Sequence, residues 1–214
     1  MVKSPSNYYK DKNIAKNYDQ ERFSSLAGRT FNELEKRNIR KAFRALDYKA
    51  TIVDVPCGTG RLAEVLLEEG FRVIGMDISA AMLEQAKLRL TRFGERFTCQ
   101  VVDMLDPHLV IQERYDAALC ARVLMHFPLD DQIIFLRNVA SMISERVVFT
   151  QSWVSNYQRA RRKLKSLLHH QDPVNYPISS IDLTRLLTGA GLRELKRIRP
   201  CSLITEEIIV IAGR

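Results

Sequence analysis

The segment from residue 51 to residue 69 constrains the fold of this 214-residue chain more than any other part of it. A β-branched run breaks into a loop that carries Gly58 and Gly60, and an amphipathic segment follows at once. Because glycine lacks a Cβ and tolerates positive φ, glycines between a strand and a helix let a ligand lie against bare backbone. The segment therefore predicts a strand, a tight turn, a helix and a nucleotide-type pocket.

Apolar runs and amphipathic segments alternate along most of the chain, beginning with a helical period from Phe31 to Leu46. This alternation predicts an α/β fold with a doubly wound, mostly parallel sheet and right-handed crossovers. We expect strands at 51–56, 72–76, 96–102, 115–121 and 146–151, helices at 61–69, 80–92, 129–142 and 181–190, and a terminal antiparallel hairpin of 192–198 and 203–211.

The composition is that of an ordinary globular chain, with 46% hydrophobic and 27% charged residues. No run approaches the ~20 apolar residues that span a bilayer, and the first 16 residues have no signal-peptide core, so we expect a cytoplasmic protein. The four cysteines form no Cys-x-x-Cys pair, which indicates reduced thiols and no zinc site. We expect no bound metal.

A formal net charge of +8 is the unusual property of the composition. Lysine and arginine gather at 3–16, 159–165 and 193–199. Such an excess attracts nucleic acid, anionic lipid surfaces or acidic small molecules, although a solvated helix face and general solubility are the preferred explanation. Aromatic residues do not interleave the basic runs, which argues against a stacking platform for single-stranded nucleic acid. The amphipathic stretch 158–169 is a candidate for peripheral membrane contact.

Three acids decide which nucleotide the pocket takes. Gly58 and Gly60, with Asp77 about 20 residues on, fit the dinucleotide fingerprint. However, the Asp54 carboxylate would repel a pyrophosphate and favour a cationic group. S-adenosylmethionine (SAM) carries an ammonium and a sulfonium, its ribose diol suits Asp77, and its adenine amine suits Asp103. The combination indicates SAM.

On these residues the chain resembles the class I SAM-dependent methyltransferases, in the small-molecule branch that includes ubiquinone and menaquinone biosynthesis methyltransferases. The family's acid-x-x-x-Gly-x-Gly motif is matched by 54–60, with Pro56 and Cys57 in place of the more frequent small or apolar residues. Since proline has no N–H, this loop offers one backbone amide fewer. The resemblance implies a seven-stranded sheet whose last strand is antiparallel.

The resemblance also implies an arrangement of parts. Residues 1–46 would form an N-terminal lid and leading helix, 47–214 the SAM-binding domain, and 153–178 an insertion on the acceptor side. It further implies that the following residues bind the donor SAM, which leaves as S-adenosylhomocysteine (SAH): Tyr18, Arg29, Asp54, Pro56, Gly58, Gly60, Asp77, Ile78, Met82, Asp103, Met104 and Arg122.

Methyl transfer from a sulfonium is an in-line displacement, so much of its rate comes from holding donor and acceptor in near-attack geometry. A general base is needed where the acceptor keeps its proton at neutral pH. His126, after the fourth expected strand, has a suitable pKa range and is the candidate catalytic residue.

The predicted function is therefore SAM-dependent methyl transfer to an O or N atom of a small or lipid-like acceptor, which the basic charge allows to be anionic. One alternative is an RNA methyltransferase that uses the basic surface. Two others are a nicotinamide-dependent oxidoreductase and a catalytically silent SAM-binding partner subunit.

Overall fold

The computed structural model describes residues 24–154, 175–200 and 206–214. Its helices are α3 (Leu26–Phe43), α4 (Arg61–Glu68), α5 (Ala80–Leu90), α6 (Leu129–Ser141) and α8 (Ser180–Gly189), with two 3₁₀ turns, η1 (Thr91–Arg96) and η2 (Leu124–His126). Its strands are β1 (Thr51–Asp54), β2 (Arg72–Asp77), β3 (Phe97–Val101), β4 (Tyr115–Cys120), β5 (Ile143–Ser152), β6 (Arg193–Ile198) and β7 (Glu207–Gly213).

The strands form one seven-stranded sheet in the order β3-β2-β1-β4-β5-β7-β6. β1 pairs in parallel with β2 on one side and β4 on the other, whereas β7 runs antiparallel to β5 and β6. The strand order therefore reverses between β1 and β4, and in open α/β sheets ligands bind in the crevice at such a switch point. The predicted fold class and the terminal hairpin are confirmed.

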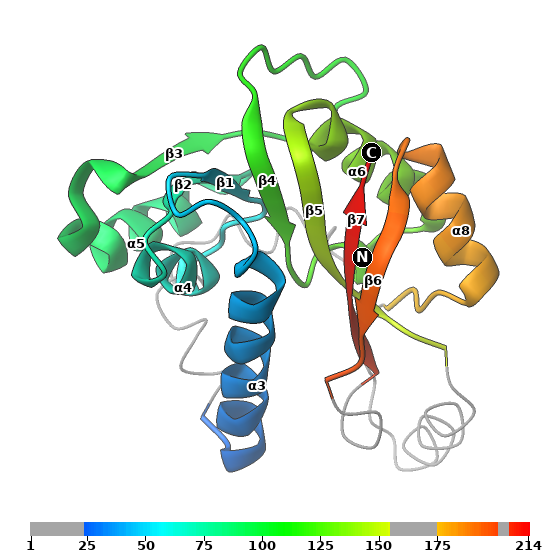
Figure 1. Ribbon diagram of the computed structural model, residues 1–214, viewed down its shortest axis with the longest axis horizontal. Helices are drawn as coiled ribbons and strands as arrows, with labels where there is room; N and C mark the ends of the chain where they lie inside the picture. The colour runs from blue at the N-terminus through cyan, green and yellow to red at the C-terminus, as the bar shows by residue number, and fades with distance from the viewer. Residues whose placement is uncertain (1–23, 155–174, 201–205) are drawn as a thin grey trace, which may run out of the picture.

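Helices cover both faces of the sheet. One core joins residues of α3, α4 and α5 to the strands, and includes Ile39, Phe43 and Leu66. The other joins α6 and α8 to the strands, and includes Leu136 and Leu186. Figure 1 shows α3 extending from the edge of the sheet at which β4, β5 and β6 end. This helix therefore lies at the edge where ligands bind.

Several element boundaries differ from the sequence prediction. α3 begins at Leu26 instead of Phe31, because the Ser25 side chain accepts a hydrogen bond from the Gly28 N–H and caps the helix. β1 ends at Asp54, and α5 gives way after Leu90 to the 3₁₀ turn η1, in which Gly94 has a φ of 56°. β5 begins at Ile143, and β7 covers Glu207–Gly213 in place of 203–211.

Two helix ends carry caps that their residue types favour. The Ser79 side chain accepts from the Met82 N–H at the start of α5, and Gly70 has a φ of 101° directly after the C-cap of α4. Cys57 and Cys120 are buried free thiols, and Cys99 is a half-buried one. Several predictions fall outside the described residues: Tyr18 and the rest of the lid within 1–23, Cys201 with the start of the expected strand 203–211, and residues 155–174, which include the amphipathic stretch 158–169.

Candidate functional site

The two glycines of the β1–α4 loop have different roles. Both have positive φ, 55° at Gly58 and 78° at Gly60, which is the N-cap of α4. A Cβ on Gly60 would stand 2.8 Å from Leu90 Cδ1, whereas a Cβ on Gly58 would meet no atom within 4 Å. Gly60 thus permits close packing of the loop on α5, and Gly58 leaves its side of the loop open to a ligand.

Asp77, the last residue of β2, is tied to this loop by its carboxylate. Oδ2 accepts a 2.8 Å hydrogen bond from the Gly58 N–H, and Oδ1 accepts one of 2.8 Å from the Ser79 N–H. Burial raises the pKa of Asp77, and these backbone hydrogen bonds partly offset the increase. Since a carboxylate has about four acceptor positions, the two that remain can receive the hydroxyls of a diol.

Asp54, the last residue of β1, lies at the floor of the crevice with 1% of its surface exposed. Burial raises its pKa well above the usual value, although the nearby Arg61 and a hydrogen bond from the backbone of Ala63 favour the ionised form. Oδ2 has no hydrogen-bond partner among the residues that the structure describes. An acceptor atom in this situation suits a cationic ligand group.

The predicted adenine side is less enclosed. Asp103 is exposed two residues beyond the end of β3, and its Oδ1 accepts a 2.9 Å hydrogen bond from the Leu105 N–H. Met82 and Met104 are buried, with 2% and 3% exposed surface, while Ile78 is half-buried. Met104 therefore packs in the core behind the loop that carries Asp103. Pro56, which precedes the glycines, is half-buried and follows a cis peptide bond.

Arg122 stands on the other side of the switch point, two residues after the end of β4. Its φ is 60°, and its N–H donates a 2.8 Å hydrogen bond to Oγ1 of Thr150 on β5. Its guanidinium lies over the Phe31 ring of α3, with its carbon 4.9 Å from the ring centroid. The arginine is thereby placed in the crevice and held from α3.

Three polar residues around the glycine loop were missed by sequence reasoning. Asn32 and Glu35 of α3 accept hydrogen bonds of 2.6 Å each from Arg61, the first residue of α4. Arg89 of α5 donates to the Thr59 carbonyl in the middle of the loop, at 3.2 Å. Glu35 carried a signal, because Phe31, Ile39 and Ala42 share its face of the helix. An acid within an apolar stripe indicates a buried partner.

His126, the predicted base, ends the short turn η2 and is partly exposed. A buried amide pair supports this turn: Gln132 donates a 2.7 Å hydrogen bond to the carbonyl of Phe127, and Gln151 donates one of 2.8 Å to Gln132. Both glutamines are completely buried. The turn is thus anchored to α6 and β5 at the carboxyl edge of the sheet.

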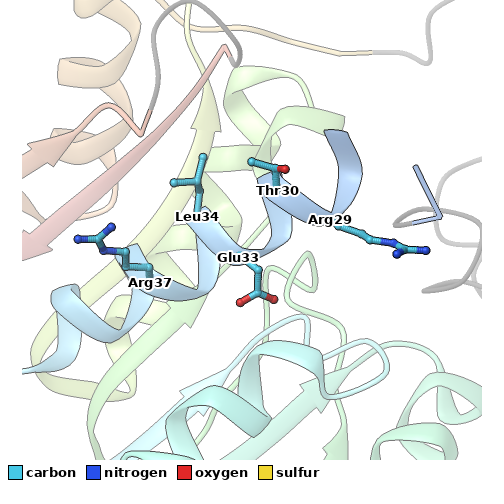
Figure 2. A pocket seen from close by; sticks show the side chains of 5 residues that line it. All are labelled: Arg29, Thr30, Glu33, Leu34 and Arg37. Atoms are coloured by element: carbon cyan, nitrogen blue, oxygen red, sulfur yellow. The ribbon is translucent and has the colours of Figure 1, made fainter. Parts of the chain in front are cut away.

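Arg29, a predicted donor contact, is exposed in the first turn of α3. Figure 2 shows it with the other residues that line a hollow of about 430 Å³, all of them from α3: Thr30, Glu33, Leu34 and Arg37. Spacings of three and four residues put these side chains on one helical face. Arg29 therefore lies on the part of the α3 surface that borders this hollow.

A cationic and aromatic cluster lies farther along the same edge. Trp153 follows β5, and the guanidinium carbons of Arg197 and Arg199 lie 4.6 and 5.4 Å from the centroid of its indole ring. Arg197 is also paired with Glu194 through a 2.7 Å contact. β5 and β6 end at one edge, with β7 between them, so this cluster lies on the side of the crevice remote from Asp77.

Part of this chain is similar in sequence to known methyltransferases. Residues 52–146 match the family described as "Methyltransferase domain". The magnesium protoporphyrin IX methyltransferase of Arabidopsis thaliana is 28% identical over 69% of this chain and 47% of that protein. The ubiquinone biosynthesis O-methyltransferase of Serratia proteamaculans is 33% identical over 38% of this chain and 34% of that protein.

Solved structures share the fold across almost the whole chain. The magnesium protoporphyrin IX methyltransferase of Synechocystis with bound SAH has a TM-score of 0.79 at 17% identity, covering 98% of this chain and 97% of that one. Human N-acetylserotonin methyltransferase in complex with SAM has a TM-score of 0.72 at 18% identity, covering 100% of this chain and 59% of that one.

The strand order and the acid-lined glycine loop define a Rossmann-like methyltransferase fold. The chain combines this fold with the match to the methyltransferase domain over residues 52–146. It spans half the length or less of the curated relatives it matches. No helix among the described residues is both long and apolar enough to cross a membrane. Nor does any group of three His, Cys, Asp or Glu side chains in 24–154, 175–200 and 206–214 form a metal site.

Proposed function

We propose that this protein binds SAM in the crevice between β1 and β4 and transfers its methyl group to an oxygen or nitrogen of a small-molecule acceptor. The observation that carries the proposal is the convergence of Asp54, Asp77 and the open side of Gly58 at the switch point of the sheet. SAM supplies the electrophilic methyl carbon. An acceptor lone pair forms the new bond, and the S–C electron pair stays on sulfur as SAH leaves.

The residues present fit the donor's charges and hydrogen-bonding groups. Asp54 Oδ2 is a buried acceptor without a partner in the described structure, as an ammonium requires. Asp77 keeps acceptor capacity for ribose hydroxyls, and Gly58 gives backbone access. Asp103 and Ile78 lie on the adenine side, and Arg122 offers a guanidinium to the donor's carboxylate. Arg29 and Tyr18 stay secondary candidates from the N-terminal segment.

We assign proton removal to His126 where the acceptor is protonated. The imidazole lies at the carboxyl edge, on a turn fixed by Gln132 and Gln151. A fixed turn allows the base to hold one position relative to the acceptor, which general-base catalysis requires. Methyl transfer itself releases a neutral thioether, so orientation supplies the rest of the rate.

An oxygen acceptor is favoured by the relatives, which are named as O-methyltransferases of ubiquinone biosynthesis and as methyltransferases of magnesium protoporphyrin IX. We also propose that the acceptor is anionic. Arg199 lies beside the indole ring of Trp153 at the remote end of the crevice, and Arg197 lies beside it as well. Three strand spacings of about 4.8 Å separate β4 from β6, so an acceptor of roughly 15 Å would reach from the donor methyl to this cluster.

The decisive experiment incubates the purified protein with methyl-labelled SAM and a cell extract fractionated into small molecules, lipids and RNA. We expect label in an anionic small-molecule fraction. Label in RNA, with binding that weakens steeply with salt, would establish the RNA alternative instead. SAM binding without transfer to any fraction would identify a silent partner subunit. The cytoplasmic location is likewise a proposal, tested by cell fractionation.

A further inference from the structure

We infer that Glu35 is a positioning residue of the donor site: it holds Arg61 and Arg122 across the switch-point crevice and so orients the guanidinium that receives the donor's carboxylate. The inference rests on the proposed function, because it concerns how the same site recognises the methionyl end of SAM. Glu35 belongs to α3, outside the segment 52–146 that matches the family.

The first contact joins Glu35 to the donor loop. Its Oε2 lies 2.6 Å from a terminal nitrogen of Arg61, whose other terminal nitrogen donates to Asn32 Oδ1 at 2.6 Å. Arg61 follows Gly60 directly and starts α4. Glu35 and Asn32 together therefore fix the plane of a guanidinium that stands next to the glycine loop.

The second contact joins the same oxygen to the other side of the crevice. Glu35 Oε2 lies 3.9 Å from NH1 of Arg122, which follows β4. The positive φ of Arg122 and the hydrogen bond from its N–H to Thr150 fix its backbone, and Phe31 packs against its guanidinium. One carboxylate oxygen thus connects the segments that follow β1 and β4, the two strands that flank the switch point.

The burial of this group needs a reason beyond fold stability. Glu35 is 1% exposed, and its Oε1 has no hydrogen-bond partner among the described residues. Buried ion pairs often contribute no more to stability than apolar residues of similar volume, because desolvation opposes the Coulomb attraction. They do fix the geometry of the groups they join. An unpaired acceptor beside two arginines and Asp54 therefore agrees with a site organised for a zwitterionic ligand.

The test compares two ligands that differ in the methionyl end. SAH carries the amino-acid carboxylate, whereas 5′-methylthioadenosine keeps the adenosine and sulfur and lacks that end. In Glu35→Gln we expect the calorimetric Kd of SAH to rise about tenfold or more, which corresponds to about 1.4 kcal/mol. The Kd of methylthioadenosine should stay within about twofold. Glu33→Gln, an exposed acid on the same helix, is the matched control and should change neither.

The outcomes separate the inference from the proposed function. A wild-type protein that binds neither SAM nor SAH would contradict the proposed function itself. The inference alone would be overturned if the wild type binds SAH and the Glu35→Gln substitution has the same effect on both ligands. That effect could be an equal loss of affinity for SAH and methylthioadenosine, or no loss for either. Should Glu35→Gln not fold, Arg122→Gln must show the same split between the ligands. Glu35→Asp, which retains the carboxylate, should recover part of the lost SAH affinity.

Discussion

Asp77 Oδ2 accepts a 2.8 Å hydrogen bond from the backbone N–H of Gly58, which joins the end of β2 to the glycine loop that follows β1. The contact makes one carboxylate serve two purposes. It fixes the open side of the loop and presents acceptor atoms where a ribose would lie. In the proposed donor site, the group that organises the loop would therefore also contact the ligand.

Asp77→Asn should weaken SAM binding by about 10- to 100-fold, since a hydrogen bond to a charged acceptor contributes roughly 1.5–3 kcal/mol. The side-chain amide of the variant also places an N–H donor against one of the two backbone N–H groups, of Gly58 and Ser79, that the carboxylate accepts from. Isothermal titration with SAM measures the effect. Asp106→Asn is the control, because Asp106 makes a similar backbone hydrogen bond in an exposed turn away from the loop. Equal affinities for the wild type and Asp77→Asn would remove the ribose assignment.

The two loop glycines should respond differently to alanine. Gly60→Ala forces a Cβ to 2.8 Å from Leu90 Cδ1 and adds the strain of positive φ, so we expect a loss of unfolding free energy of about 2–4 kcal/mol. Gly58→Ala adds only the backbone strain, about 1–2 kcal/mol, and its methyl group enters the space assigned to the donor. Urea denaturation and SAM titration of both variants test this. A Gly58→Ala variant with wild-type SAM affinity would place the donor elsewhere.

His126→Ala should reduce kcat by about 10²- to 10⁴-fold, the usual contribution of a general base, while the SAM affinity changes little. Steady-state kinetics with the identified acceptor, together with SAM titration, separate the two effects. His108→Ala, in an exposed turn after β3, is the control. Wild-type turnover in His126→Ala would exclude the imidazole from the mechanism.

Asp54 should make stability depend on pH. Burial raises the pKa of its carboxyl well above the usual value, so the folded protein keeps a proton that the unfolded chain releases near pH 4. The stability that Asp54 contributes is thus fully present below pH 4 and is lost as pH rises through its folded pKa. Asp54→Asn should reduce this decline of the unfolding free energy with rising pH, measured by urea denaturation at a series of pH values from about 4 upward. Asp77, whose pKa is also raised by burial, should keep part of the slope. Identical pH profiles for Asp54→Asn and the wild type would show that Asp54 is not buried in the uncharged form.

The residues that sequence reasoning found are those whose signal is local. Gly58, Asp54 and Asp77 stand at fixed distances from strand ends, so spacing alone predicts that a parallel sheet brings them to one edge. The glycine loop, the mostly parallel sheet and its terminal hairpin are therefore confirmed by the structure, with errors confined to boundaries such as the start of β5. Those boundaries depend on pairing between strands, as between Ile143 and Tyr115, which no local pattern contains.

The parts that were missed depend on contacts between distant segments. Glu35 meets Arg61 and Arg122 only after α3 has packed beside α4 at the crevice. Trp153 likewise meets Arg199 through the arrangement of β5, β7 and β6. Glu35 has a weak signal in the sequence, because it is an acid within an apolar helical face. The partners of Glu35 and Trp153 become known only from the folded chain.

Calorimetric titration of the intact protein with SAM, and separately with NAD, tests the central claim most directly. The site predicts saturable one-to-one binding of SAM that Asp77→Asn weakens, with no measurable binding of NAD, because Asp54 disfavours a pyrophosphate. Tight binding of NAD without binding of SAM would contradict the account.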